Sequence, residues 1–434
     1  MTRRHGSGSD DATASDAESS RAAAEAFDGA VTIDALREGA DDLLQDVVSL
    51  RRQLHRWPEI GNHLPLTQEH VLAAIEDLPL AVTIHETTSG VAALLDGGRP
   101  GPTVLLRGDM DALPLTEATG LDFASRHEGT MHACGHDTHT AMLAGAARLL
   151  AAHADRIAGR VLFMFQPGEE GEHGARYMLD EGLLDVPPLA DGTASPVTHA
   201  FALHITSTLP SNWLSARGGP TMASADRLLV DIVGAGGHAS EPYRAVDPIP
   251  VACEIVQALQ TMITRTVDVF DPSVVTVARI SAGTTSNIIP GTAQIEGTIR
   301  AVSEATRRRV HDNIKRVVAG VAAAHGVEAM VTIATGYPVT VNDADAAETA
   351  LRAAAAVTGT ARTVRLAHPI MGAEDFSYIL QQVPGAIMFL GGTPLDHDPA
   401  TAAPNHSDRV MFDEEVMSTG ITAYAAMALS ALAG

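Results

Sequence analysis

The order in which apolar runs alternate with helical segments is the feature that most constrains the fold of this chain. In its first half, apolar runs such as 161–167 and 200–205 are separated by segments with helical periodicity, for example 138–153. Continuous apolar strands that alternate with helices are typical of a mostly parallel sheet covered by helices on both faces. The same alternation resumes near the C-terminus, with an apolar run at 386–391 and a helix predicted over 417–433. The sequence therefore predicts an α/β fold.

A different pattern occupies the middle of the chain. Between residues 221 and 332, the sequence predicts a strand, a helix, two strands, a helix and a strand, which is the β-α-β-β-α-β order of a small ferredoxin-like domain. We predict one α/β domain in two chain segments, 31–220 and 333–434, with this α+β domain inserted at 221–332. Residues 1–30 are rich in Ser, Ala, Asp and Gly and predict a disordered tail.

Composition limits the partners and the compartment. The chain has 434 residues with 29 Lys and Arg against 53 Asp and Glu, a formal charge of −24, which argues against nucleic acid and anionic membrane surfaces as partners. No stretch approaches the roughly 20 apolar residues that span a bilayer, and no secretory signal is evident. Two cysteines, Cys134 and Cys253, do not make a disulfide framework. We expect a cytoplasmic protein.

Two acidic residues follow one of the apolar runs. In LLRGDMDALP, Asp109 and Asp111 are two positions apart, so an extended chain would place both carboxylates on one face. They stand where a parallel strand would end, which is where open α/β sheets bind ligands. The alternative is a solvated acidic turn closed by Pro114.

The segment MHACGHDTH contains four potential metal ligands within eight residues: His132, Cys134, His136 and His139. A thiolate and imidazoles clustered this closely suit zinc or another borderline-soft cation. The alternative is a buried small cysteine followed by a helix that Asp137 or Thr138 caps.

Glu169 and Glu170 are adjacent in FMFQPGEEGEHGA, after an apolar strand and a Pro-Gly turn. Carboxylates held together at the edge of a core repel each other unless a cation compensates them. Neighbouring side chains of an extended segment point in opposite directions, so one Glu could bind metal while the other acts as a general base. The alternative is an ordinary acidic loop. His204 and His406 are further candidate ligands, although a lone histidine is more often structural.

Three polar residues of the predicted insertion are also candidates. His238 lies in GAGGHAS, Asn287 in TTSNIIP and Arg300 in GTIR. The glycines would allow a substrate or another backbone to approach closely. The GAGG segment lacks the GxGxxG or GK[ST] pattern of a phosphate loop, which disfavours nucleotide binding. Each of the three polar residues, taken alone, could be structural.

Taken together, six short motifs resemble the M20 metallopeptidase family, and within it the branch of hippurate hydrolases, N-acyl-amino-acid amidohydrolases and auxin-conjugate hydrolases. The motifs occur in the family's order over about residues 40–430, as GDMDALP, MHACGHD, QPGEEG, GGHAS, SNIIP and MGAEDFS. The resemblance implies two divalent metal ions per subunit, zinc or manganese, with cobalt also compatible.

The resemblance also implies roles for individual residues. Carried over position by position, the metal ligands are Cys134, His136, Glu170, His204 and His406. Glu169 matches the general acid/base. Asp109 stands where sister branches have a ligand histidine, so Asp109 and Asp111 are expected to support the ligands from behind. His238 and Asn287 match residues that bind the scissile carbonyl or the substrate carboxylate, often from the partner subunit, and Arg300 is a carboxylate-binding candidate.

The implied activity is hydrolysis of the amide bond of N-acyl or N-aroyl amino acids, by a homodimer joined through the inserted domain, which would also act as a lid. Two alternatives remain open. One is a metal-free amidase with Cys134 as nucleophile and His136 or His139 as base. The other is a non-catalytic, zinc-stabilised protein that binds acyl amino acids.

Two positions depart from the pattern of this branch. After the lid histidine the branch often has Pro-His-x-x-x-Asp-Pro, whereas this chain has Tyr243 in place of the second histidine. Around the last predicted ligand, the chain reads NHSD at 405–408 where the branch usually shows LHSP. Neither change removes a predicted ligand.

Overall fold

The computed structural model describes residues 31–433, so the predicted disordered tail at 1–30 lies outside the described residues. The described chain forms two compact units. The first runs up to Gly219 and continues in Asn342–Ala367 and from Tyr378 onward, whereas the second comprises Pro220–Val341 and His368–Ser377.

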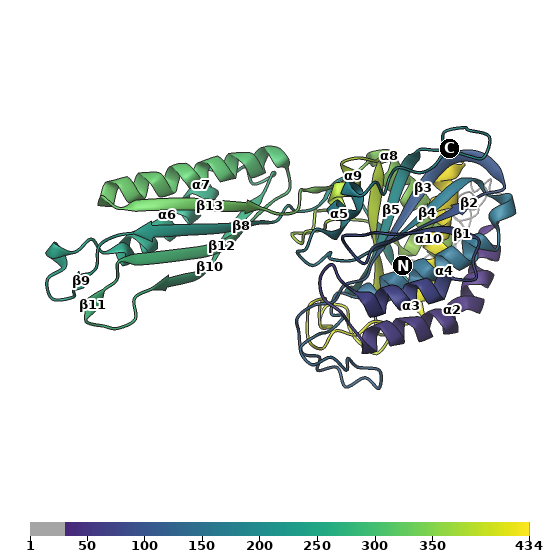
Figure 1. The fold of residues 1–434 in the computed structure, drawn as a ribbon, viewed down its shortest axis with the longest axis horizontal. Coiled ribbons are helices and arrows are strands. Elements are labelled where there is room, and N and C mark those ends of the chain that lie inside the picture. Colours follow the sequence, from purple (N-terminus) through teal and green to yellow (C-terminus); the bar gives the residue numbers. More distant parts are fainter. Residues whose placement is uncertain (1–30, 434) are drawn as a thin grey trace, which may run out of the picture. The chain divides into compact units, whose positions relative to one another are not determined.

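The first unit is built around an eight-stranded sheet in the order β1-β2-β4-β3-β5-β16-β6-β15 (Figure 1). Strands β4, β3, β5 and β16 run parallel to one another in the middle of the sheet, and β15 pairs parallel with β6, whereas the other pairs are antiparallel. The predicted mostly parallel α/β fold is therefore confirmed. The strand bounds are β1 (Leu80–Ile84), β2 (Val91–Asp96), β3 (Arg99–Asp109), β4 (Ala158–Gln166), β5 (Val197–Pro210), β6 (Leu214–Ala216), β15 (Thr363–Arg365) and β16 (Gly385–Thr393).

The central strands of this sheet are buried on both faces. Every residue of β16, and all but the first of β4, is buried, although their side chains alternate between the two faces. Helices α4 and α10 both pack on β3, and α2 lies over α4 and α10. The helices are α2 (Ile33–Arg56), α3 (Pro65–Ile75), α4 (His136–Ala151), η1 (Ala154–Arg156), α5 (Gly174–Asp180), α8 (Ala344–Thr358), η3 (Thr360–Arg362), α9 (Ser377–Leu380) and α10 (Val416–Leu432). None of the helices in residues 31–433 is long and apolar enough to cross a membrane.

The second unit contains a four-stranded antiparallel sheet in the order β10-β12-β8-β13. Along the chain its elements follow the predicted β-α-β-β-α-β order, and this strand order is that of a ferredoxin-like fold. Apolar residues that alternate along β8, Leu228, Val230 and Ile232, are fully buried in a core shared with α6 and α7. The bounds are β7 (Gly219–Met222), β8 (Asp226–Val233), β9 (Gly237–His238), η2 (Pro242–Arg244), α6 (Pro248–Thr266), β10 (Ser273–Ala282), β11 (Ile288–Ile289), β12 (Thr292–Ala301), α7 (Glu304–His325), β13 (Glu328–Thr335) and β14 (Thr340–Asn342).

The second unit is larger than the insertion predicted at 221–332. Strand β13 continues past residue 332 and pairs with β8 as far as Thr335, so a boundary at 332 falls inside a strand. The segment His368–Ser377 also belongs to this unit, since the Ala223 N–H donates to the carbonyl oxygens of Ile370 and Gly372. This short return segment has no strand or helix periodicity that would reveal its place in the sequence.

Candidate metal centre

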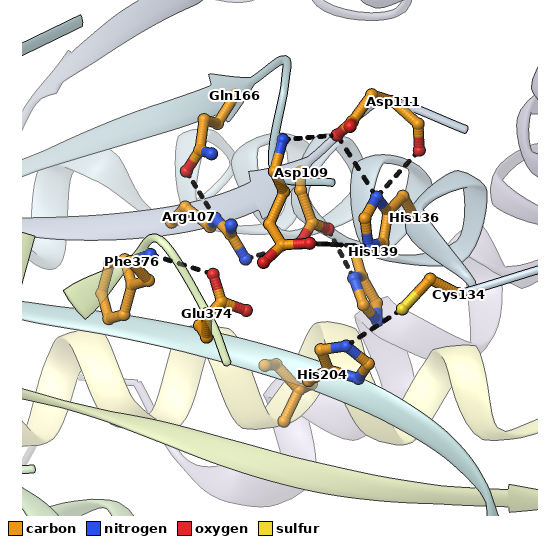
Figure 2. Close-up of polar contacts among 12 residues, drawn as sticks. Arg107, Asp109, Asp111, Cys134, His136, His139, Gln166, His204, Glu374 and Phe376 are labelled. Carbon is orange, nitrogen blue, oxygen red and sulfur yellow. Dashed lines mark hydrogen bonds and ion pairs between the residues drawn. The ribbon is translucent and has the colours of Figure 1, made fainter. Parts of the chain in front are cut away.

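The five predicted metal ligands come from four segments of the first unit. Cys134 precedes α4 and His136 begins it, whereas Glu170 follows β4 and His204 lies within β5. His406 comes from the loop between β16 and α10. Because β3, β4 and β5 are parallel neighbours, the segments at their carboxyl ends meet at one edge of the sheet. Figure 2 shows the side chains of Cys134 and His204 facing each other there.

The donor atoms of these five side chains lie close together. Cys134 Sγ is 3.5 Å from His204 Nε2 and 3.3 Å from His406 Nε2. Glu170 Oε1 is 3.2 Å from His406 Nε2 and 3.9 Å from His136 Nε2. Within each of the groups Cys134–His136–His204 and Cys134–Glu170–His406, the donor atoms all lie within 4.8 Å of one another. The structure thus brings together residues that the sequence separates by as many as 272 positions.

Hydrogen bonds orient two of the histidines for coordination. His136 Nδ1 is 2.8 Å from the carbonyl oxygen of Asp111 and donates to it, and His204 Nδ1 donates to the Ile205 carbonyl at 2.7 Å. The Nε2 lone pair of each ring is then directed at the cluster, as in metal-binding histidines. Among the described residues, the buried Nε2 of His136 has no hydrogen-bond partner. A thiol, imidazoles and a carboxylate in this arrangement fit a divalent cation such as zinc.

The surroundings of Cys134 do not suit a free nucleophile. Its side chain is buried, and burial, together with the charge of Glu170, raises the pKa of the thiol. Reactive cysteines are partly exposed and have a lowered pKa. A cation at the site would instead favour the thiolate. These features argue against the metal-free amidase.

Asp111 shapes the segment that carries the paired glutamates. Its two carboxylate oxygens accept the backbone N–H groups of Glu169 and Glu170, each at 2.9 Å. The pair lies in a turn rather than in the extended segment that the sequence suggested. Both carboxylates approach the same atom, since Glu169 Oε2 lies 4.0 Å and Glu170 Oε1 3.9 Å from His136 Nε2. The expectation that the two side chains diverge is therefore wrong, because the turn tied to Asp111 brings them to one side.

Asp109 is held by a different set of partners. Its carboxylate accepts from Arg107 Nη1 at 2.6 Å and from His139 Nδ1 at 2.5 Å, and Arg107 Nε donates to Gln166. Burial alone would raise the pKa of Asp109, but the positive charge of Arg107 and the neighbouring imidazoles hold it well below its usual range. Asp109 and Asp111 are both fully buried, so the solvated-turn alternative is wrong.

His139 is not placed as a metal ligand. Its Nδ1 donates to Asp109, and its Nε2 accepts the backbone N–H of Ile205 at 2.7 Å, so both ring nitrogens are occupied. Since Nε2 accepts a hydrogen bond, the ring is neutral in this arrangement, and burial lowers its pKa. The same contacts join β3, α4 and β5 beneath the ligands. His139 therefore supports the cluster from behind.

His132 and Asp137 belong to a separate buried cluster with α2. Asp137 accepts from Arg51 Nε at 2.8 Å and lies 2.9 Å from His55 Nδ1, whereas burial lowers the pKa of His132 to about 3. Asp137 does not cap α4, because the residue before the helix is Gly135, in the left-handed region with φ +89°. This network anchors the first turn of α4. Its partners lie more than 80 residues earlier, beyond the reach of local sequence patterns.

The candidate residues of the second unit do not all lie together. His238 in β9 pairs with Ile288 in β11, so it is close to Asn287, whose carbonyl accepts the Ala239 N–H. His238 is exposed, and its Nδ1 accepts from the Ser240 hydroxyl at 2.8 Å, which leaves Nε2–H as a donor. Arg300 lies at the far end of β12, about 26 Å along a strand from Thr292 at roughly 3.3 Å per residue.

Two buried acids in the motif MGAEDFS received no role from the sequence. Glu374 and Asp375 are only 1% and 0% exposed and lie in the return segment of the second unit. Glu374 Oε1 accepts the Phe376 N–H at 2.9 Å (Figure 2). The sequence feature that could have indicated their burial is the position of both acids directly before Phe376 in this motif.

Comparison with known proteins defines the class of this chain. The family model described as peptidase family M20/M25/M40 matches residues 105–430. The chain is 34% identical to thermostable carboxypeptidase 1 of Saccharolobus solfataricus over 403 residues, 92% of this chain and 98% of that protein. It is also 34% identical to N-acetylcysteine deacetylase of Bacillus subtilis over 389 residues, 89% of this chain and 97% of the relative. The molecule is thus an amide-bond hydrolase.

A solved structure agrees with this class. A Bacillus subtilis protein described as a dinuclear metal-binding peptidase of the M20 family superimposes with a TM-score of 0.77 at 31% identity, covering 91% of this chain and 99% of that chain. The chain belongs to the M20/M25/M40 peptidase family.

Proposed function

We propose that this chain hydrolyses the amide bond of N-acyl or N-aroyl amino acids and releases a carboxylic acid and a free amino acid. The observation that carries the proposal is the convergence of five candidate metal ligands beside the buried carboxylate of Glu169. The names of the two relatives support the substrate class. A carboxypeptidase and an N-acetylcysteine deacetylase both cleave an amide whose nitrogen belongs to an amino acid with a free carboxylate.

The cofactors of this proposal are two divalent ions, zinc or manganese, with cobalt also compatible. Five donors exceed what a single four-coordinate ion needs. They are Cys134, His136, Glu170, His204 and His406. Cys134 is the one residue common to the two donor groups, Cys134–His136–His204 and Cys134–Glu170–His406. When bound, the ions would polarise the amide carbonyl and lower the pKa of a water molecule towards neutrality.

Glu169 is the proposed proton carrier. Its carboxylate is buried next to the ligands, and Asp111 fixes its backbone through the N–H group. In the proposed reaction, a Glu169 oxygen takes the proton of the attacking water and then gives it to the leaving nitrogen, which yields the free amine. Glu170 differs in role because its carboxylate approaches His406 at 3.2 Å, within the ligand group.

The second unit is proposed to supply hydrogen-bond donors to the substrate. His238 Nε2–H and the Asn287 amide are suited to bind the scissile carbonyl or the substrate carboxylate, where negative charge develops. Strands β10 and β13 are the edges of the described four-stranded sheet. Pairing of an edge with a second copy across a two-fold axis would cover it and form a homodimer, in which these donors act on the partner's site.

The test is an assay of metal-loaded protein against a panel of N-acetyl, N-benzoyl and longer N-acyl amino acids. We expect turnover of several members, and loss of turnover on chelation. Glu172→Gln, in the same loop but exposed, is the matched control for Glu169→Gln. Binding of the panel without any turnover would support the non-catalytic alternative. Turnover that survives chelation but is lost with iodoacetamide would support the metal-free one.

A further inference from the structure

The loop that carries His406 is fixed by a residue outside the proposed ligand set. Asn405 precedes His406, at the position where the branch that this sequence resembles usually has leucine. Its side-chain amide is part-buried and contacts three residues of the first unit, one in the segment before α4 and two in β5. The proposed chemistry gives this residue no role.

The Asn405 amide uses both its donors and its acceptor. Nδ2 donates to the carbonyl oxygens of Cys134 and Ile205, each at 3.0 Å, and Oδ1 accepts the backbone N–H of Ser207 at 3.2 Å. The Ile205 carbonyl is the same oxygen to which His204 Nδ1 donates. One side chain therefore connects the backbone of Cys134, the hydrogen bond that orients His204, and the loop of His406.

The backbone of His406 needs such support. Its φ is +69°, in the left-handed region that non-glycine residues adopt only where the surrounding structure holds them. The Ser407 N–H donates to the Pro404 carbonyl and closes a tight turn around Asn405 and His406. The His406 N–H in turn donates to the Ala133 carbonyl at 2.8 Å. The turn is thereby tied to the residue before Cys134.

We propose that Asn405 is a positioning residue that sets the separation of Cys134, His204 and His406, and thereby the affinity of the site for divalent metal. The proposal rests on the metal centre of the proposed function. Asn405 contacts backbone groups rather than donor atoms, so it acts through the ligands. Residues that orient metal ligands typically change metal affinity by about 10–100-fold when they are replaced.

The test compares Asn405 with a second asparagine of the same unit whose side-chain amide also hydrogen-bonds to several backbone groups. Asn342 also uses both donor and acceptor, since its Nδ2 donates to the Arg217 and Ile387 carbonyls and its Oδ1 accepts the Ile387 N–H. It joins segments that carry no proposed ligand. Asn405→Ala and Asn342→Ala would be compared by zinc titration against a competing chelator, with thermal unfolding of both apo-proteins.

We expect Asn405→Ala to lower zinc affinity by about 10–100-fold, and Asn342→Ala to lower the unfolding temperature with zinc affinity unchanged. Asn405→Asp keeps the shape and the acceptor for Ser207 but cannot donate to two carbonyls, so it should lose affinity as well. Asn405→Asp also provides the test of zinc affinity if the alanine variant does not fold.

Two results would overturn the proposal: wild-type zinc affinity in Asn405→Asp and Asn405→Ala, or an equal loss of affinity in Asn342→Ala. Either would leave Asn405 with a structural role alone. The outcome is independent of the substrate assay. A wild-type protein that binds zinc but cleaves no N-acyl amino acid would contradict the proposed function and leave this test standing.

Discussion

In the first unit, the carboxylates of Asp109 and Asp111 are buried, and hydrogen bonds to backbone carbonyls orient the rings of His136 and His204. In the second unit, by contrast, His238 is exposed, and among its described contacts the side chain is held through Ser240 alone. The first arrangement is typical of a site whose geometry is set before substrate arrives. The second is typical of a group that completes a site after movement. We infer that metal binding depends on the first unit, and that the second unit affects turnover without affecting metal retention.

The largest expected effect separates proton transfer from metal binding within the first unit. Glu169→Gln should keep its metal but lose about 10²–10⁴-fold in kcat, because the amide cannot carry the proton. Metal content and kcat, measured on the same preparation, check this. Glu172→Gln should be unaffected in both. Near-normal turnover in Glu169→Gln would show that the assigned role is wrong.

The next effect addresses the second unit. His238→Ala should lose roughly 10²–10³-fold in kcat, the usual cost of removing one donor to a developing oxyanion, with metal content unchanged. Mixing this variant with Glu169→Gln under subunit exchange should restore part of the activity, because one site of a mixed dimer has both residues intact. Failure to recover despite proven exchange would place the action of His238 within its own chain.

A smaller effect is expected from Asp111, which hydrogen-bonds to the segment that carries Glu170. Asp111→Ala removes the acceptor for the N–H groups of both Glu169 and Glu170, and should weaken metal affinity by about 10–100-fold. Chelator competition measures the change, with Glu172→Ala as control. An Asp111 variant with unchanged affinity would mean that the turn holds its shape without this carboxylate.

The smallest effect concerns Arg300. Because it lies at the other end of β12 from the β9–β11 pair, we expect Arg300→Ala to raise KM by at most about fivefold, which corresponds to a weak ion pair of about 1 kcal/mol, with kcat unchanged. Steady-state kinetics with a panel substrate check this. A fall in kcat comparable to that of His238→Ala would show that both residues act on the same substrate group.

The contrast between the units also explains what the sequence could predict. Local motifs were sufficient to indicate Cys134, His136 and Glu170 as candidate metal ligands. A thiol, an imidazole and a carboxylate are common metal donors, and other donors lie a few residues away in the same motif. The alternation of strands and helices was sufficient for the sheet, since its periodicity is a local property.

Long-range contacts account for what the sequence did not reveal. Arg107 and Asn405 act through hydrogen bonds to residues as far as 271 positions away, which no local pattern records. The turn at Glu169 was mistaken for an extended segment because its shape depends on Asp111, 58 residues earlier. The position of Arg300 relative to His238 likewise follows from strand register, which the order of elements does not give.

The most direct test of the account is the metal content of the wild-type chain and of Glu170→Gln after saturation and removal of free metal. Elemental analysis should find about two ions per wild-type chain, as in two-metal hydrolytic sites, and fewer in the variant, since Glu170 lies with His406 and Cys134 in one donor group. One ion or fewer in the wild-type chain, or equal content in both proteins, would contradict the dinuclear centre.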